Sequence, residues 1–500
     1  MLQRSQADEL IRQRQQGLGN PIVAFKDGDQ QFVAVKNRLI WSDRWKTFPD
    51  FLGDYIKEVF KDAWGKAEFA KPIAERHPII QWYQAYCLYQ RQFIKTPGEI
   101  GSGHVTGVVF CYLGLAYNLY LMEHNVELQA RMIARLKDPA NFQGAFYELV
   151  VAGALIRAGY ELILEDEVDR RSKHCEFAAI KKSTGKRYSV EAKMRAVSGM
   201  LGRTAHDGGS DEKPLGRLIP HLCAALRKPS EAERMVFIDI NSPMDKDISE
   251  KNRPECVEAA VRALECFEGN KQAPQERAYL FVTNIACHRY LDDLPVLAIA
   301  PFGFNIPDFN RSGMYRHIDR YRQEQKHKDA LEIAQALADA AVFPNSFDGC
   351  PPSELRLNEP KRLMVGETYD FTDASPGGLI ATVTSIAACE KSRSVMAVAM
   401  TPDGKSHLLH ETMSEAAAID FAAFGENYFG EVGRSGGVAK NAYDLFCGMM
   451  EIHADYNREQ LARQLGLGPD DPGLAHLNDN ELREFVAERL VASVDAHSSN

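Results

Sequence analysis

The segment YSVEAKMR at residues 188–195 decides which fold we expect, because it alternates polar and apolar side chains. Successive side chains of a β-strand point to opposite faces, so the apolar ones share one face, and Glu191 and Lys193 lie on the other. These two residues are next-nearest neighbours on that face, about 7 Å apart by the rise of a strand. The segment therefore predicts a half-buried strand that holds an acid beside a lysine. A purely structural ion pair is the alternative interpretation.

A second carboxylate, Glu176, stands near the start of the preceding apolar segment, residues 175–180. A short polar turn at 183–186 joins the two segments, which predicts an antiparallel hairpin in which Glu176 faces Glu191. Two neighbouring carboxylates repel each other unless a cation lies between them. Magnesium takes hard oxygen ligands and retains water molecules for chemistry. The hairpin therefore indicates a Mg²⁺ site, with Mn²⁺ as a substitute ion.

A third carboxylate comes from the helix expected over residues 141–158, which Gly159 ends as a left-handed cap. Helical spacing surrounds Glu148 with small and apolar residues. A carboxylate on such a face is unfavourable unless it is hydrogen-bonded, paired or near a metal. The alternative is a buried glutamate satisfied by a backbone amide or by an arginine.

The order of these residues resembles that of the PD-(D/E)XK, or restriction-endonuclease-like, nuclease superfamily. That family places a glutamate on a first helix, an acid at the start of a second strand and an acid-x-Lys triplet on a third strand. The resemblance implies a metal site of Glu176, Glu191 and Glu148, and a catalytic set completed by Lys193. Lys193 would orient the attacking water and counter the phosphate charge. One departure is Cys175-Glu176 in place of the usual Pro-Asp, which adds a methylene and shifts the ligand position.

The resemblance implies a metal-dependent endonuclease that hydrolyses phosphodiester bonds. It favours DNA as the substrate, but RNA remains open because metal-assisted cleavage does not identify the sugar. A role in restriction or in defence against foreign DNA is an analogy with the family. Two alternatives remain: a catalytically inactive nuclease-fold scaffold that binds nucleic acid or a protein partner, and a purely structural interaction protein.

The net charge of −10 argues against a protein that coats nucleic acid over its whole surface, so any contact with DNA must be local. Basic residues gather around the expected hairpin and could hold a phosphate backbone without reading sequence. A solvated hairpin surface is the alternative. The residues are Arg170, Arg171, Lys173, Lys181, Lys182, Lys186, Arg187 and Arg195.

The rest of the chain predicts an α/β protein with a restriction-endonuclease-like mixed sheet at its centre. Apolar segments at 235–240 and 278–283, with a helix near 255–266 between them, predict further strands joined by an α/β crossover. A homo-oligomer or a protein partner could use the terminal regions. The expected regions are a mainly helical one with a β-hairpin at 1–137, the nuclease-like core at 138–310, a long helix and linker at 311–350, a small β unit at 351–412 and a helical region at 413–500.

Cysteine usage and the N-terminal sequence favour a cytoplasmic protein without membrane contact. The ten cysteines are scattered singly, which is typical of reduced thiols. The N-terminus lacks the apolar run of a secretion signal. The most apolar stretch, residues 105–121, is interrupted by polar residues and predicts a buried helix rather than a membrane span.

Overall fold

The structure, a computed structural model, describes residues 2–96, 98–164, 176–197, 213–243, 254–309, 316–356, 361–371, 379–432, 439 and 441–498. The chain divides into two compact units. The first comprises Met1–Pro307 and Ala330–Gly430, and the second comprises Asp308–Asp329 and Glu431–Asn500. The three candidate carboxylates belong to the first unit.

The N-terminal part of the first unit contains a three-stranded antiparallel sheet and a set of helices. The sheet has the order β1 (Val23–Asp27), β2 (Gln30–Val35) and β3 (Arg38–Ser42), so the expected hairpin gains a third strand. The helices are α1 (Leu2–Gln16), α2 (Phe48–Phe60), α3 (Asp62–Phe69), α4 (Pro78–Gln90), α5 (Gly107–Val109), α6 (Leu115–Asn125) and α7 (Ala130–Lys137). A π-helical turn, Phe110–Gly114, links α5 to α6.

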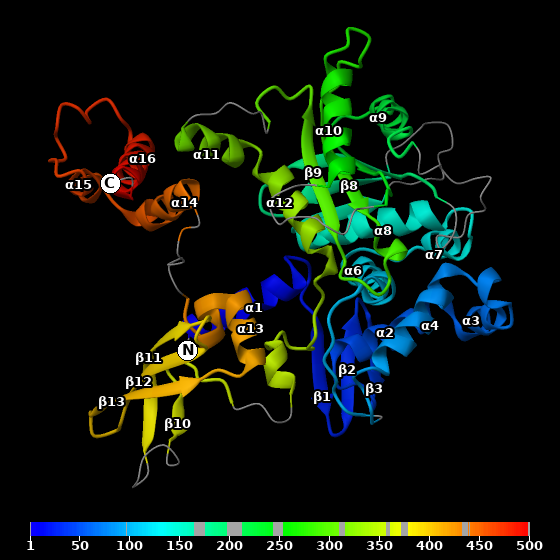
Figure 1. Ribbon diagram of the computed structural model, residues 1–500, viewed down its shortest axis with the longest axis horizontal. Helices are drawn as coiled ribbons and strands as arrows, with labels where there is room; N and C mark the ends of the chain where they lie inside the picture. The colour runs from blue at the N-terminus through cyan, green and yellow to red at the C-terminus, as the bar shows by residue number, and fades with distance from the viewer. Residues whose placement is uncertain are drawn as a thin grey trace. The chain divides into compact units, whose positions relative to one another are not determined.

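A six-stranded mixed sheet forms the centre of the first unit (Figure 1). Its order is β4 (Tyr160–Leu164), β5 (Phe177–Lys181), β6 (Arg187–Met194), β7 (Glu233–Asp239), β8 (Ala278–Ile285) and β9 (Leu297–Phe304). Strand β7 runs parallel to both β6 and β8, whereas the pairs β4–β5, β5–β6 and β8–β9 are antiparallel. The parallel pairs require crossovers, which α9 (Leu218–Leu226) and α10 (Glu255–Glu268) supply.

Helices cover both faces of this sheet. On one face, buried side chains of β7 and β8 such as Val236 and Leu280 pack against α9 and α10 in a single apolar cluster. On the opposite face, α8 (Phe142–Arg157) packs against the sheet, and Tyr147 hydrogen-bonds to Thr283 at 2.8 Å. The residues of β6 alternate between these faces. Glu191 is directly opposite Val236 in the register, so its side chain lies on the face covered by α9 and α10.

Two glycines fix the position of α8. Gly159, which follows the helix, has a φ of +83°, the left-handed conformation that we expect of a glycine cap. Gly153 lies where α8 crosses α6, and a Cβ at this position would be 2.0 Å from Asn118 Oδ1. A side chain at residue 153 would therefore displace the Asn118 side chain of α6.

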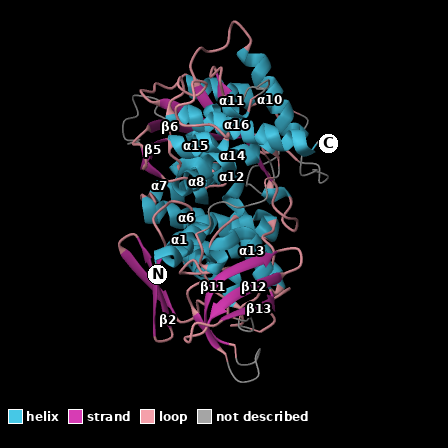
Figure 2. Cartoon of the chain, turned by 90° about the vertical axis from the view of Figure 1, so that its left-hand side faces the viewer, coloured by secondary structure: helices cyan, strands magenta, loops and turns pink. Residues whose placement is uncertain are grey.

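A four-stranded antiparallel sheet follows later in the first unit (Figure 2). Its strands are β10 (Thr368–Asp370), β11 (Ile380–Cys389), β12 (Ser394–Met400) and β13 (Ser406–Thr412). Helix α13 (Glu415–Phe424) packs on this sheet and shares its apolar cluster through Ala418 and Phe424. The small β unit therefore extends beyond residue 412 and includes the first helix of the region expected to be purely helical.

The second unit is helical and consists of α11 (His317–Lys326), α14 (Ala442–Ile452), α15 (Arg458–Gln464) and α16 (Asp479–Ser498). Its apolar contacts include Ile318 against Phe446 and Val491. The sequence predicts one long helix across 313–341, but the structure has two helices, α11 and α12 (Lys328–Ala338). The helix ends at His327, whose buried ring packs against Phe309 at 5.1 Å.

The apolar stretch near residues 105–121 forms buried helix between α5 and α6. Within the described part of the chain, no helix combines the length and the apolar character needed to cross a bilayer.

Candidate functional site

The β5–β6 hairpin brings Glu176 beside Glu191. Phe177 is directly opposite Val190, and the Glu176 amide donates a hydrogen bond of 3.0 Å to the Val190 carbonyl. Continuing this antiparallel register by one residue places Glu176 opposite Glu191, with both side chains on the same face. Cys175 lies outside the described residues, so β5 is described from Phe177 onward.

Lys193 lies between these two carboxylates. Its Nζ is 2.7 Å from Glu176 Oε1 and 2.7 Å from Glu191 Oε1. Glu191 is buried, with 2% of its surface exposed. The strand alternation therefore places Glu191 and Lys193 on one face, as the sequence predicts, and a single ammonium group is shared by two carboxylates.

Two further cations, which the sequence did not identify, complete the cluster. Lys228, two residues beyond α9, lies 2.7 Å from both oxygens of Glu191 and 4.0 Å from Glu176. Arg135 of α7 forms two parallel hydrogen bonds to Glu148, of 2.5 and 2.6 Å. Neither residue belongs to the helix or hairpin that carries the motif, so no local pattern singles them out.

The environment of Glu148 agrees with the alternative of an arginine-paired buried glutamate. Burial raises the pKa of Glu148 and the nearby Glu176 charge adds to this effect, while the hydrogen bonds from Arg135 oppose it. The Lys193 charge also lowers the pKa of Glu148, by less than Arg135 does. Glu148 thus belongs to the same electrostatic cluster as the hairpin acids.

The pKa values of Glu176 and Lys193 are shifted in opposite directions. Burial raises the pKa of Glu176, but the charges of Lys193, Lys228 and Arg135 outweigh it, so the pKa lies below its usual value. Burial lowers the pKa of Lys193, but the two glutamates outweigh burial and raise the pKa above its usual value. Both groups are therefore held in their charged forms.

The cluster also offers the donor set of a hard divalent cation. Both hairpin carboxylates already converge on one positive charge, the Lys193 ammonium. Among the described residues, Glu191 Oε1 is buried and has no hydrogen-bond partner, although two ammonium groups lie at ion-pair distance. Carboxylate oxygens are the ligands that Mg²⁺ prefers. The hairpin carboxylates thus supply the type of oxygen donor that such an ion takes, but in the described part of the chain no three His, Cys, Asp or Glu residues form a metal-binding group.

The basic residues expected around the hairpin have different positions. Arg170, Arg171 and Lys173 lie outside the described residues, whereas Lys182, Lys186 and Arg187 are exposed. Lys181 is buried and bonds to the Ala158 carbonyl and Glu332, and Arg195 is buried and bonds to the carbonyls of Ile240 and Asn241. The prediction of phosphate contacts by Lys181 and Arg195 is therefore wrong, because interior carbonyls and one carboxylate already hold their donors.

A buried polar network lies at the carboxyl end of β7. Asp239 is fully buried and accepts hydrogen bonds from the Thr283 hydroxyl and from the amides of Ile285 and Asn241. Its carbonyl accepts a 2.9 Å bond from the Arg195 amide, which fixes the chain two residues after Lys193. Burial raises the pKa of Asp239 to about 6, although these hydrogen bonds oppose it.

Asp239 is expected to produce a measurable pH dependence of stability. A carboxyl group with a raised pKa binds more protons in the folded than in the unfolded state. It therefore destabilises the fold above about pH 6, and this effect disappears as the pH falls below its ordinary pKa of 3.8. Relative to Asp239→Asn, the wild type should gain unfolding free energy between pH 7 and pH 4. Urea unfolding across this range tests the sign, and a constant difference would contradict it.

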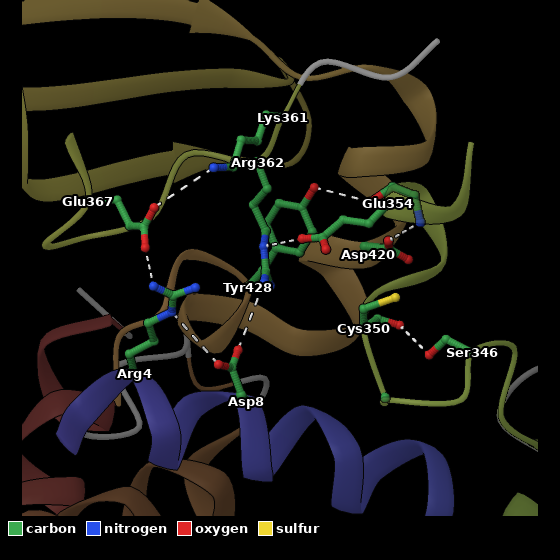
Figure 3. A network of polar contacts seen from close by, with 12 residues as sticks. Arg4, Asp8, Ser346, Cys350, Glu354, Lys361, Arg362, Glu367, Asp420 and Tyr428 are labelled. Carbon is green, nitrogen blue, oxygen red and sulfur yellow. Dashed lines mark hydrogen bonds and ion pairs between the residues drawn. The ribbon is translucent and has the colours of Figure 1, made fainter. Parts of the chain in front are cut away.

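A second charged network joins α1 to the β10–β13 sheet (Figure 3). Arg362 forms ion pairs with Glu354 at 2.6 Å and Asp8 at 3.8 Å, and its guanidinium lies over the Tyr428 ring. Glu367 contacts both Arg4 and Lys361. These ion pairs add to the apolar contact by which Ile11 of α1 joins the core of this sheet.

Comparison of the chain with models of protein families, with curated proteins and with solved structures finds no match.

Proposed function

We propose that this chain is a metal-dependent nuclease that hydrolyses phosphodiester bonds, with DNA as its preferred substrate. The observation that carries the proposal is the meeting of Glu176 and Glu191 at the Lys193 ammonium, 2.7 Å from each. Glu148 adds a third carboxylate close enough for its charge to affect that of Glu176. A phosphodiesterase that uses divalent cations needs acidic oxygens and a positive group at one place.

The order of elements supports a restriction-endonuclease-like core. Helix α8 carries Glu148, the residue before β5 is Glu176, and β6 carries the Glu191-Ala192-Lys193 triplet. The sheet continues through α9 into the parallel strand β7. This is the sequence of helix, second strand and third strand on which the family resemblance rests.

The chemistry follows from the charges of these residues. Glu176 and Glu191 would hold a Mg²⁺ or Mn²⁺ ion, with Glu148 acting directly or through a water molecule. When bound, such an ion lowers the pKa of a coordinated water and neutralises charge on the phosphate. Lys193 is held protonated between the two carboxylates, so we assign it to orienting the water and countering phosphate charge rather than to proton abstraction.

A catalytically inactive scaffold is the second candidate function. The observation that favours it is the internal pairing of every carboxylate, since Arg135 holds Glu148 through two hydrogen bonds and lysines hold the other two. Such a protein would bind nucleic acid or a partner without cutting. Restriction or defence against foreign DNA remains an analogy with the family and applies only to the active form.

A cleavage assay separates these functions. The purified chain is incubated with plasmid, linear duplex DNA, single-stranded DNA and RNA, in Mg²⁺, Mn²⁺ or EDTA. We expect cleavage of DNA with either metal and none in EDTA. Binding without cleavage in both metals would favour the scaffold. No cleavage and no binding with any of the four substrates would overturn the nuclease and the nucleic-acid-binding scaffold.

A further inference from the structure

Lys228 contacts the same carboxylates as Lys193 but comes from a different part of the fold. It lies just beyond α9, and its Nζ is 2.7 Å from both oxygens of Glu191. Its side chain is 17% exposed, whereas that of Glu191 is 3% exposed. A partly exposed lysine side chain thus contacts the buried carboxylate that we propose as a metal ligand.

The charges of the cluster balance without a metal. Three carboxylates, those of Glu148, Glu176 and Glu191, are matched by the cations of Arg135, Lys193 and Lys228. A divalent cation at Glu191 would therefore create an excess of positive charge. Like charges in a site of low dielectric repel strongly, so the ion and the Lys228 ammonium compete for Glu191.

Lys228 can move away from Glu191 more readily than Lys193 can. Lys193 is fixed on β6 and is shared equally by two carboxylates, at 2.7 Å from each. Lys228 is 4.0 Å from its second carboxylate, Glu176, and its flexible four-carbon stem extends from a chain segment outside the sheet. Among the described residues, these two glutamates are its only acidic partners.

Helix α9 adds a further polar group, His221, near the cluster. His221 lies on α9, and Lys228 follows the end of that helix. His221 lies near Lys193 and Arg217, because both charges lower the pKa of its ring in addition to burial. Its Nε2 is buried without a hydrogen-bond partner in the described part of the chain. The α9 side of the cluster therefore has polar groups that can contact the phosphate backbone of a nucleic acid.

We infer that Lys228 is a phosphate-binding and positioning residue: it neutralises Glu191 while no divalent cation is bound, and it contacts a substrate phosphate once a cation holds that carboxylate. This inference rests on the proposed function. It assigns a nucleic-acid contact to the α9 side of the site, where the sequence did not predict one. It also explains how the charges of the buried carboxylates are balanced by cations while no substrate is bound.

The test is Lys228→Met, because methionine keeps the approximate length of the side chain and removes its charge. Mn²⁺ binding to the metal-free protein is measured by calorimetry and should tighten roughly tenfold, since the competing charge is gone. Binding of a short fluorescent DNA duplex in Ca²⁺ is measured by anisotropy and should weaken roughly tenfold, since a phosphate contact is lost. These opposite changes distinguish the inferred role from a structural one, which would weaken both.

Matched variants complete the experiment. Lys405→Met removes an exposed lysine of the turn between β12 and β13, paired with Asp403 at 2.8 Å, and should change neither constant. Lys228→Arg should recover most of the DNA affinity because it restores the charge. Lys228→Gln provides a second neutral variant if the methionine protein folds poorly.

The outcomes separate this inference from the function on which it rests. The role of Lys228 would be overturned if, in Lys228→Met, both binding constants stay within about twofold of wild type, or if both bindings weaken. The proposed function would still hold in that case, provided that the wild type binds Mn²⁺ and cuts DNA. A wild type that neither binds Mn²⁺ nor cuts any substrate would overturn the function and this inference together.

Discussion

The Glu191→Gln variant is expected to lose metal-dependent cleavage by about 10³-fold or more, with the fold intact. Glutamine has nearly the same size, so the packing around this buried side chain of β6 is preserved. It removes the negative charge that Lys193 and Lys228 both contact at 2.7 Å. A neutral amide is a weaker ligand for a hard cation, and metal affinity should fall with the rate. Initial cleavage rates in Mg²⁺, with calorimetry in Mn²⁺, measure both effects.

A glutamate two strands away in the same sheet provides the control for this substitution. Glu161 of β4 is exposed and lies opposite Ile180, so Glu161→Gln should cut at the wild-type rate.

Lys193→Met should also reduce cleavage by about 10²- to 10³-fold, because it removes the positive group beside the reacting phosphate. Cleavage at the wild-type rate by both Glu191→Gln and Lys193→Met would show that the chemistry lies elsewhere in the chain.

The geometry of the hairpin could be predicted because its rules are local. A period of two fixes which side chains of β6 share a face, and a short turn fixes the antiparallel register that sets Glu176 beside Glu191. The end of α8 at Gly159 follows from backbone conformation alone. The parallel pairing of β7 with β8 follows from the helix between them.

The counter-charges could not be predicted, because they come from elements distant along the chain. Arg135 reaches Glu148 from α7, and Lys228 reaches Glu191 from the end of α9. The requirement for a partner was visible in the sequence, since an apolar helix face surrounds Glu148, but the identity of the partner depends on helix packing. Proximity along the chain also misplaced Lys181 and Arg195, which the tertiary fold buries.

The Arg135→Met variant is expected to lose about 2–3 kcal/mol of unfolding free energy in metal-free buffer. The Glu148 side chain is only 7% exposed, so its charge would remain buried without its bidentate partner. Arg135 is 27% exposed and can be hydrated when it loses Glu148, so Glu148→Gln should be less destabilising. Urea unfolding of each variant, with the double variant Arg135→Met/Glu148→Gln, measures the asymmetry.

The double variant decides whether the loss comes from an uncompensated charge or from lost packing. Once Glu148 is neutral, removing Arg135 no longer leaves a buried charge unpaired, so the double variant should be more stable than Arg135→Met alone. Strictly additive losses would instead assign the effect to the hydrophobic stem of Arg135.

If Glu148 also takes part in metal binding, Mg²⁺ should restore stability to Arg135→Met more than to the wild type, because the ion replaces the missing positive charge. Equal stabilisation of both proteins by Mg²⁺ would separate Glu148 from the metal site and leave it as a structural partner of α7.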